Sequence, residues 1–224
     1  MKGQTQAVTA VLITSVVIGS VASAYVWGTP LLEKSQSESE LNNVENEIVD
    51  LYREINRVSD EGTGTAEVLT LGESVSNSRN FRISINESEN FIQITTNADN
   101  PPYALDTWTL IQGKSLQGLS FGSGPFGLKG NERPGVIGVK PAGGPGSAVM
   151  EYRIEFRNLK AETTTSTVLE KVNITSQGQS FSAGEATIRI ANQGTVWEEG
   201  DERVELPSGE KLRRKNTNIR ISFR

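Results

Sequence analysis

Residues 7–32, AVTAVLITSVVIGSVASAYVWGTPLL, decide the architecture of this 224-residue chain. No charged residue occurs from Gln4 to Leu32. At about 1.5 Å per residue, a helix of these 26 residues is about 39 Å long, which exceeds the roughly 30 Å hydrocarbon core of a bilayer. Tyr25 and Trp27 near its end are typical of the aromatic belt at a membrane interface. We therefore expect a membrane-spanning helix over residues 4–32.

The charges that flank this segment predict its direction. Lys2 precedes it and Glu33 follows it, so the positive-inside rule places the N-terminus in the cytoplasm and the rest of the chain outside the cell. The alternative is a secretory signal peptide cleaved after the A-x-A match at residues 22–24. The apolar run is longer than the 7–15 residues of a signal-peptide core, and a helical pattern continues beyond it. We therefore favour a membrane-anchored protein at the cell surface.

Beyond Pro30 the helical pattern becomes amphipathic. Apolar residues recur at alternating spacings of three and four, which defines one stripe on a helix: Leu41, Val44, Ile48, Leu51, Ile55 and Val58. Pro30 is expected to kink the helix without ending it, and Gly62 and Gly64 are expected to end it. We predict one long helix over residues 4–60, apolar over 4–32 and amphipathic over 33–60. The stripe packs either on the chain's own β domain or against other copies, since two and a half heptads do not decide between them.

From about residue 65 the apolar period changes from helical to two. Alternating residues predict half-buried strands, with these apolar members: Phe81, Ile83, Ile85, Phe91, Ile92, Ile94, Tyr152, Ile154, Phe156, Val172, Ile174, Ile188, Ile190, Ile219, Ile221 and Phe223. Short strands without a second helical pattern predict an antiparallel sandwich or barrel over residues 65–224, so the fold class is α+β. The glycine-rich residues 113–146 are expected to form long loops around short strands such as 136–139.

Composition limits the chemistry of the chain. It contains neither cysteine nor histidine, so Ser-His-Asp and Cys-His catalytic sets are impossible and the commonest metal ligands are missing. We expect no enzyme, metal site or cofactor, although two carboxylates brought together in space could still act on glycans. The net charge of −5 offers no basic footprint for nucleic acid. Two sequons, at Asn86 and Asn173, are candidate N-glycosylation sites, and the apolar neighbours of Asn173 place it on the solvated face of its strand.

The first residues, MKGQTQAVTAVL, resemble archaeal type IV pilin-like proteins with the short, class III signal peptide. That family has a charged residue and Gly before a motif Q-x-S-x-E-x-x-x-L. Lys2 and Gly3 match the leader, and Gln4 and Leu12 match the first and last motif positions. The chain departs from the motif at two positions, with Gln6 in place of Ser and Val8 in place of Glu.

This resemblance, which covers about the first 30 residues, implies a leader over residues 1–3. A prepilin peptidase would cleave between Gly3 and Gln4, and the pilus assembly machinery would then bundle the helix with identical copies in an extracellular adhesion filament. The resemblance also favours an immunoglobulin-like sandwich. The side chains expected in the filament core are Val8, Val11, Leu12, Val16, Ile18, Val21, Tyr25 and Trp27. The alternative function is a single-span, membrane-anchored binding module that never polymerises.

Overall fold

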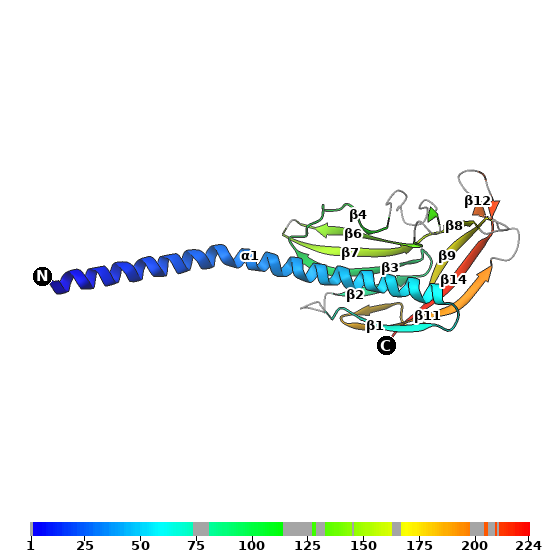
Figure 1. Cartoon of the computed structure of the whole chain (residues 1–224), viewed down its shortest axis with the longest axis horizontal. Helices are drawn as coiled ribbons and strands as arrows, with labels where there is room; N and C mark the ends of the chain where they lie inside the picture. Colours follow the sequence, from blue (N-terminus) through cyan, green and yellow to red (C-terminus); the bar gives the residue numbers. More distant parts are fainter. Residues whose placement is uncertain are drawn as a thin grey trace. The chain divides into compact units, whose positions relative to one another are not determined.

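The computed structural model describes residues 2–73, 81–113, 127–128, 133–144, 146–162, 167–197, 204–205, 209 and 211–224. The chain divides into two compact units, residues 1–39 and residues 40–224. The fold is α+β, with one long N-terminal helix followed by a sandwich-like domain rich in antiparallel strands (Figure 1). This confirms the predicted fold class.

The helix α1 runs without interruption over Lys2–Glu61. It continues through Pro30, because one missing backbone hydrogen bond does not end a helix of this length. Gly62 follows the last helical residue with a φ of 95°, a left-handed conformation that glycine adopts without steric cost. The end predicted from Gly62 and Gly64 is therefore correct to within two residues.

Twelve of the strands form two six-stranded sheets, and β12 pairs with β13 in a separate ribbon. The first sheet has the order β1-β11-β14-β9-β8-β5, with bounds β1 Ala66–Leu71, β11 Ala186–Trp197, β14 Arg214–Phe223, β9 Thr167–Ser176, β8 Leu159–Glu162 and β5 Gly127–Leu128. The second has the order β10-β2-β3-β7-β6-β4, with bounds β10 Phe181–Ala183, β2 Arg82–Asn86, β3 Phe91–Asp99, β7 Ser147–Phe156, β6 Gly135–Gly143 and β4 Thr109–Gln112. The ribbon joins β12 Val204–Glu205 to β13 Lys211–Leu212.

One hydrophobic core joins the stripe of α1 to both sheets. Most of the apolar residues predicted from the period of two along β2, β3, β7, β9, β11 and β14 are buried in it. Phe223 is only partly buried against this core, and Phe91 is buried but does not belong to it. Most neighbouring strands are antiparallel, but β14 pairs with β9 in parallel and β5 pairs with β8 in parallel. The domain is therefore a mixed sandwich, and the narrower immunoglobulin-like description stays a prediction.

The glycine-rich segment contains a longer strand than its composition suggested. β6 covers Gly135–Gly143 and pairs with both β7 and β4, where the sequence predicted only a short strand within loops. Its glycines have a packing reason, because a Cβ on Gly135 would lie 2.5 Å from the Tyr52 ring and one on Gly138 would lie 3.2 Å from the Trp108 ring. Residues 114–126, 129–132 and 145 of this segment lie outside the described residues.

Candidate functional site: the apolar half of the N-terminal helix

The first half of α1 carries an unusual density of exposed apolar side chains. Between 54% and 79% of each of these side chains is exposed: Val11, Leu12, Ile13, Val16, Val17, Ile18, Val21, Tyr25, Val26, Trp27, Leu31 and Leu32. They occupy consecutive as well as alternate positions, so they surround the helix instead of forming one stripe. A helix that is apolar on all sides requires a nonaqueous environment, either lipid or other protein.

Three hydroxyl groups in this segment donate hydrogen bonds within the helix itself. Ser15, Ser20 and Thr29 each donate a hydrogen bond of 2.8 Å to the backbone carbonyl four residues earlier. A hydroxyl that is satisfied in this way does not need water. These three side chains are therefore compatible with a hydrocarbon or dry protein environment.

This half of α1 contains a candidate membrane span. The apolar window found within Val11–Glu61 has a mean hydropathy of 1.7, and none of it is buried. The aromatic residues Tyr25 and Trp27 are 74% and 79% exposed. Beyond them, Lys34 and Glu38 form an exposed i,i+4 ion pair at 3.8 Å on the polar stretch that follows. By length and composition, the helix meets the requirements for membrane anchoring.

The residues predicted for processing and for the filament core all lie on this helix. Gly3 and Gln4 occupy its first turns, and the side chains of Gln4 and Val8 lie outside the described residues. The other predicted core residues are all exposed: Val11, Leu12, Val16, Ile18, Val21, Tyr25 and Trp27. The sequence prediction did not include Ile13, Val17, Val26, Leu31 and Leu32, which have comparable exposure.

The second half of α1 is buried by the chain's own sheets. All six residues of the predicted stripe are at most 4% exposed: Leu41, Val44, Ile48, Leu51, Ile55 and Val58. Of the two alternatives for the stripe, the structure has the one in which it packs on the β domain. Tyr52 adds to this contact, because its hydroxyl donates to the Gly135 carbonyl at 3.1 Å.

Polar groups hold the same half of the helix in place. The Glu45 carboxylate accepts hydrogen bonds from the hydroxyls of Tyr103 at 2.7 Å and Tyr152 at 3.3 Å. Burial and the nearby Glu45 charge raise the pKa of the Tyr152 hydroxyl above its usual value. The Glu47 carboxylate accepts from the backbone N–H of Gly72 at 2.6 Å. The loop that carries Tyr103, strand β7 and the end of β1 are thereby tied to the helix.

The C-terminal end of α1 is held by a buried asparagine. Asn192 is 3% exposed, and its Nδ2 donates to the carbonyls of Val58 at 2.9 Å and Ser59 at 3.3 Å. Its Oδ1 accepts from the backbone N–H of Gly194 at 2.7 Å. Carbonyls in the last turn of a helix lack intrahelical partners, so Asn192 supplies what the helix end needs. Sequence reasoning missed this residue because its partners are 133 and 134 positions away.

The two sequons have different environments. Asn86 lies at the end of β2, where its Oδ1 accepts from the Ser88 hydroxyl at 2.8 Å and the Glu89 backbone N–H at 3.0 Å. Asn173 lies within β9, and its Nδ2 donates to Asn218 on the neighbouring β14 at 3.2 Å, while both asparagines are partly exposed. Glycosylation takes place on Nδ2, so the Asn86 site is the better acceptor by geometry.

No group of three acidic side chains among the described residues is arranged to hold a metal ion. The exposed apolar side chains make the first half of α1 a surface suited to association with lipid or protein. Comparison of the chain with protein families, with curated proteins and with solved structures gave no match.

Proposed function

We propose that this chain is the structural subunit of an extracellular type IV pilus-like filament that serves adhesion. The observation that carries the proposal is the division of one continuous helix into two halves. The first is apolar on all sides and exposed, and the second is buried in the β domain by its stripe and its polar contacts. Such a helix can join copies together through one end while the other end holds a folded domain.

The size of the exposed apolar surface supports association. Burying one large apolar side chain contributes about 1.5–3 kcal/mol, so covering the exposed side chains of residues 11–32 is worth on the order of 20 kcal/mol. Lipid supplies this cover while the chain is in a membrane. Copies of the same helix supply it after assembly, so leaving the bilayer costs little apolar contact.

The small residues of the segment support packing between copies. Gly19 and Gly28 have open space where a Cβ would lie, and Ala22, Ser23 and Ala24 are also small. Small side chains let helix backbones approach closely. The similarity of residues 1–12 to type IV pilin leaders adds the processing step, in which a prepilin peptidase cuts between Gly3 and Gln4 and frees the helix for assembly.

The test is to replace Gly3 with Val and to follow both processing and assembly. The proposal predicts a slower-migrating chain with Met1 retained and no filaments by negative-stain electron microscopy. Thr5→Ser is the matched control, since the motif leaves that position open, and it should give normal cleavage and normal filaments. Normal cleavage and normal filaments in the Gly3→Val variant would refute the proposal.

A non-polymerising, single-span binding module is the second candidate function. The exposed apolar window and the aromatic residues at 25 and 27 favour it, because a lipid bilayer alone would cover them. The two candidates differ in the mature N-terminus and in particle shape. An intact Met1 and single particles favour the module, whereas an N-terminus at Gln4 and fibres favour the filament subunit.

A further inference from the structure

The outward face of the first sheet carries neighbouring arginine side chains. Ile190 of β11 lies opposite Ile221 of β14, and both belong to the core, so the residues next to them in each strand point away from the core. Arg189 and Arg220 are two such residues. Because Arg189 lies opposite Ser222, the two arginines are diagonal neighbours across the strands. Their long side chains therefore share one patch of the outer face.

The patch continues along the end of β14. Arg224 takes the next outward position after Ser222, and its backbone N–H donates to the Thr187 carbonyl of β11 at 2.9 Å. We call Arg189, Arg220 and Arg224 the arginine row. Among the described outward-facing residues of β1, β11, β14 and β9, none is acidic. The row is thus a basic surface on a chain whose net charge is −5.

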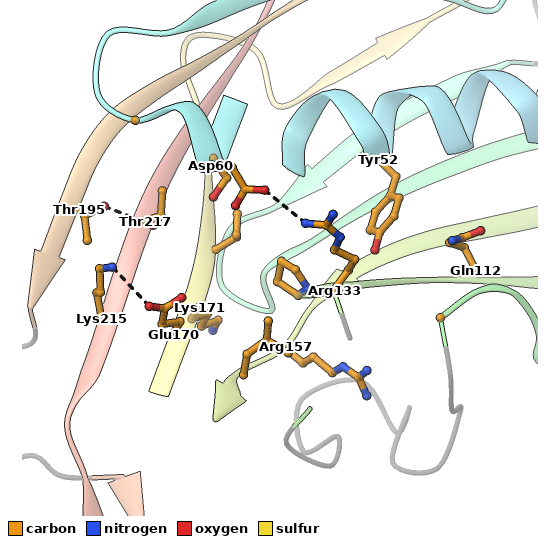
Figure 2. Close-up of a pocket in the computed structure, with 16 residues that line it drawn as sticks. Tyr52, Asp60, Gln112, Arg133, Arg157, Glu170, Lys171, Thr195, Lys215 and Thr217 are labelled. Carbon is orange, nitrogen blue, oxygen red and sulfur yellow. Dashed lines mark hydrogen bonds and ion pairs between the residues drawn. The ribbon is translucent and has the colours of Figure 1, made fainter. Parts of the chain in front are cut away.

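No carboxylate side chain neutralises the arginine row within the described part of the chain. Arg220 donates to the side-chain oxygen of Gln177 at 3.5 Å, which brings no charge. By contrast, Lys215 and Glu170 on the inward side of the neighbouring strands β14 and β9 form an ion pair at 3.3 Å (Figure 2). Like charges on neighbouring strand positions repel, so the row does not stabilise the fold. It is suited instead to an acidic partner.

The exposed surface of α1 offers such an acidic partner. Residues 40–61 of the helix include seven acidic and two basic residues. One of the basic residues, Arg57, is shared by three carboxylates: those of Glu54 at 2.8 Å, Glu61 at 2.7 Å and Glu67 of β1. One guanidinium carries one positive charge, so this Arg57 cluster has an excess of two negative charges. The carboxylate side chains are 32% to 44% exposed, so another molecule can reach them.

The two surfaces cannot meet within one chain. Glu67 lies opposite Ile190 where β1 pairs with β11, so it points to the core side of the sheet, where it contacts Arg57 of α1. The arginine row points to the other side, and the sheet separates the two. A second copy of the chain can instead bring its Arg57 cluster to the arginine row. A contact between two different surfaces of identical chains repeats from copy to copy and builds an open polymer.

The spacing of the charges is compatible with this contact. Glu54 and Glu61 are seven residues apart, about 10.5 Å along a helix. Arg220 and Arg224 are four residues apart, about 13 Å along a strand, and Arg189 lies between them on β11. The flexible side chains on both surfaces span the difference. Guanidinium and carboxylate groups also form paired hydrogen bonds, which adds geometric specificity.

We propose that the arginine row binds the Arg57 cluster of a second copy, so that neighbouring β domains join head to tail in the filament. The inference rests on the proposed function. It adds a charged contact between β domains to the apolar contact between helices, and it names the surfaces on each side.

The test is charge reversal on each surface, separately and together. One chain carries Arg189→Glu and Arg220→Glu, and a second chain carries Glu54→Lys and Glu61→Lys. Each chain alone should yield at least about tenfold less sheared filament than the unaltered chain, because like charges then meet at every contact. Co-expression of the two chains should restore the yield, since each reversed surface then meets an opposite charge on the other chain.

The matched control is Arg82→Glu combined with Arg213→Glu. Both arginines are exposed and lie outside the two surfaces, and the change in net charge equals that of the reversed arginine row. This control should give normal filament yield. Normal yield from either reversed chain alone, or no recovery on co-expression, would overturn the inference while filaments of the unaltered chain leave the proposed function intact. Absence of filaments from the unaltered chain would instead refute the proposed function, and this inference with it.

A second measurement needs no reversed charge. The chain contains no cysteine, so Ser222→Cys in the arginine row and Glu61→Cys in the Arg57 cluster can be combined in one chain. Treatment of its filaments with a flexible bismaleimide should give a ladder of covalent oligomers, whereas each single variant should remain monomeric. Absence of the ladder from filaments of the double variant would also overturn the inference.

Discussion

Replacement of Asn90 should destabilise the β domain more than any exposed polar substitution, because this side chain joins the two sheets. Asn90 is 3% exposed in the turn between β2 and β3. Its Nδ2 donates to the carbonyls of Phe156 at 3.1 Å and Val172 at 2.8 Å, and its Oδ1 accepts from the N–H of Ile174 at 2.8 Å. One side chain thus bonds to β7 of the second sheet and to β9 of the first.

The magnitude follows from these contacts. Each lost hydrogen bond costs about 0.5–1.5 kcal/mol, and the buried N–H of Ile174 would be left without its acceptor, so Asn90→Gly should cost about 3 kcal/mol. Asn90 also has a φ of 60°, in the left-handed region that glycine tolerates and alanine does not. Asn90→Ala should therefore cost about 1 kcal/mol more than Asn90→Gly.

The assay is guanidinium unfolding of the full chain in detergent micelles, followed by tryptophan fluorescence, in which Trp108 and Trp197 report on the β domain and Trp27 adds a signal from α1. We expect the midpoint to fall in the order unaltered chain, Asn90→Gly, Asn90→Ala, with unchanged slopes. Asn97→Ala, an exposed position on β3, is the control and should change stability by no more than about 0.5 kcal/mol. A loss below about 1 kcal/mol for Asn90→Ala, or a glycine variant less stable than the alanine variant, would refute the reasoning.

Three further predictions follow from other parts of the domain. On chain exported to a glycosylating cell surface, mass spectrometry should find glycan on Asn86 and not on Asn173, because the Nδ2 of Asn173 donates a hydrogen bond within the sheet. Glycan on Asn173 alone would contradict this prediction. Burial and the nearby Glu45 carboxylate raise the pKa of the Tyr152 hydroxyl above the usual tyrosine value of about 10.0. Above that pH the unfolded chain loses the hydroxyl proton while the folded chain keeps it, so the free energy of unfolding should fall as the pH rises. Urea unfolding at pH 8 and pH 11 measures this change. The free energy of unfolding should fall less between the two pH values in Tyr152→Phe than in the unaltered chain. Gly135→Ala should cost about 1–3 kcal/mol in thermal or urea unfolding, since the new Cβ would lie 2.5 Å from the Tyr52 ring, and an unchanged midpoint would show that the ring moves freely.

The fold class could be predicted from the sequence because its signals are local. The uncharged residues 7–32, the three-four spacing from Leu41 to Val58 and the alternation in the later strands each report a period within a short window. The structure agrees on the helix, on its end near Gly62 and on the strand residues that form the core. The exposed apolar half of the candidate site could also be predicted, since a helix that is apolar on all sides cannot cover itself.

The remaining features of the fold depend on contacts between residues that are far apart in the chain. The partners of Asn90 and Asn192, the parallel pairing of β9 with β14 and the meeting of Arg133 with Asp60 at the end of α1 have no signature within a local window. The glycines of β6 indicated loops by composition, but in the folded chain Gly135 and Gly138 lie in a strand beneath the rings of Tyr52 and Trp108. Thus the sequence by itself determined that the first half of α1 needs an apolar partner. Only the tertiary structure decided that the second half has its partner within the chain, because hydrophobic burial is set by which distant surfaces meet.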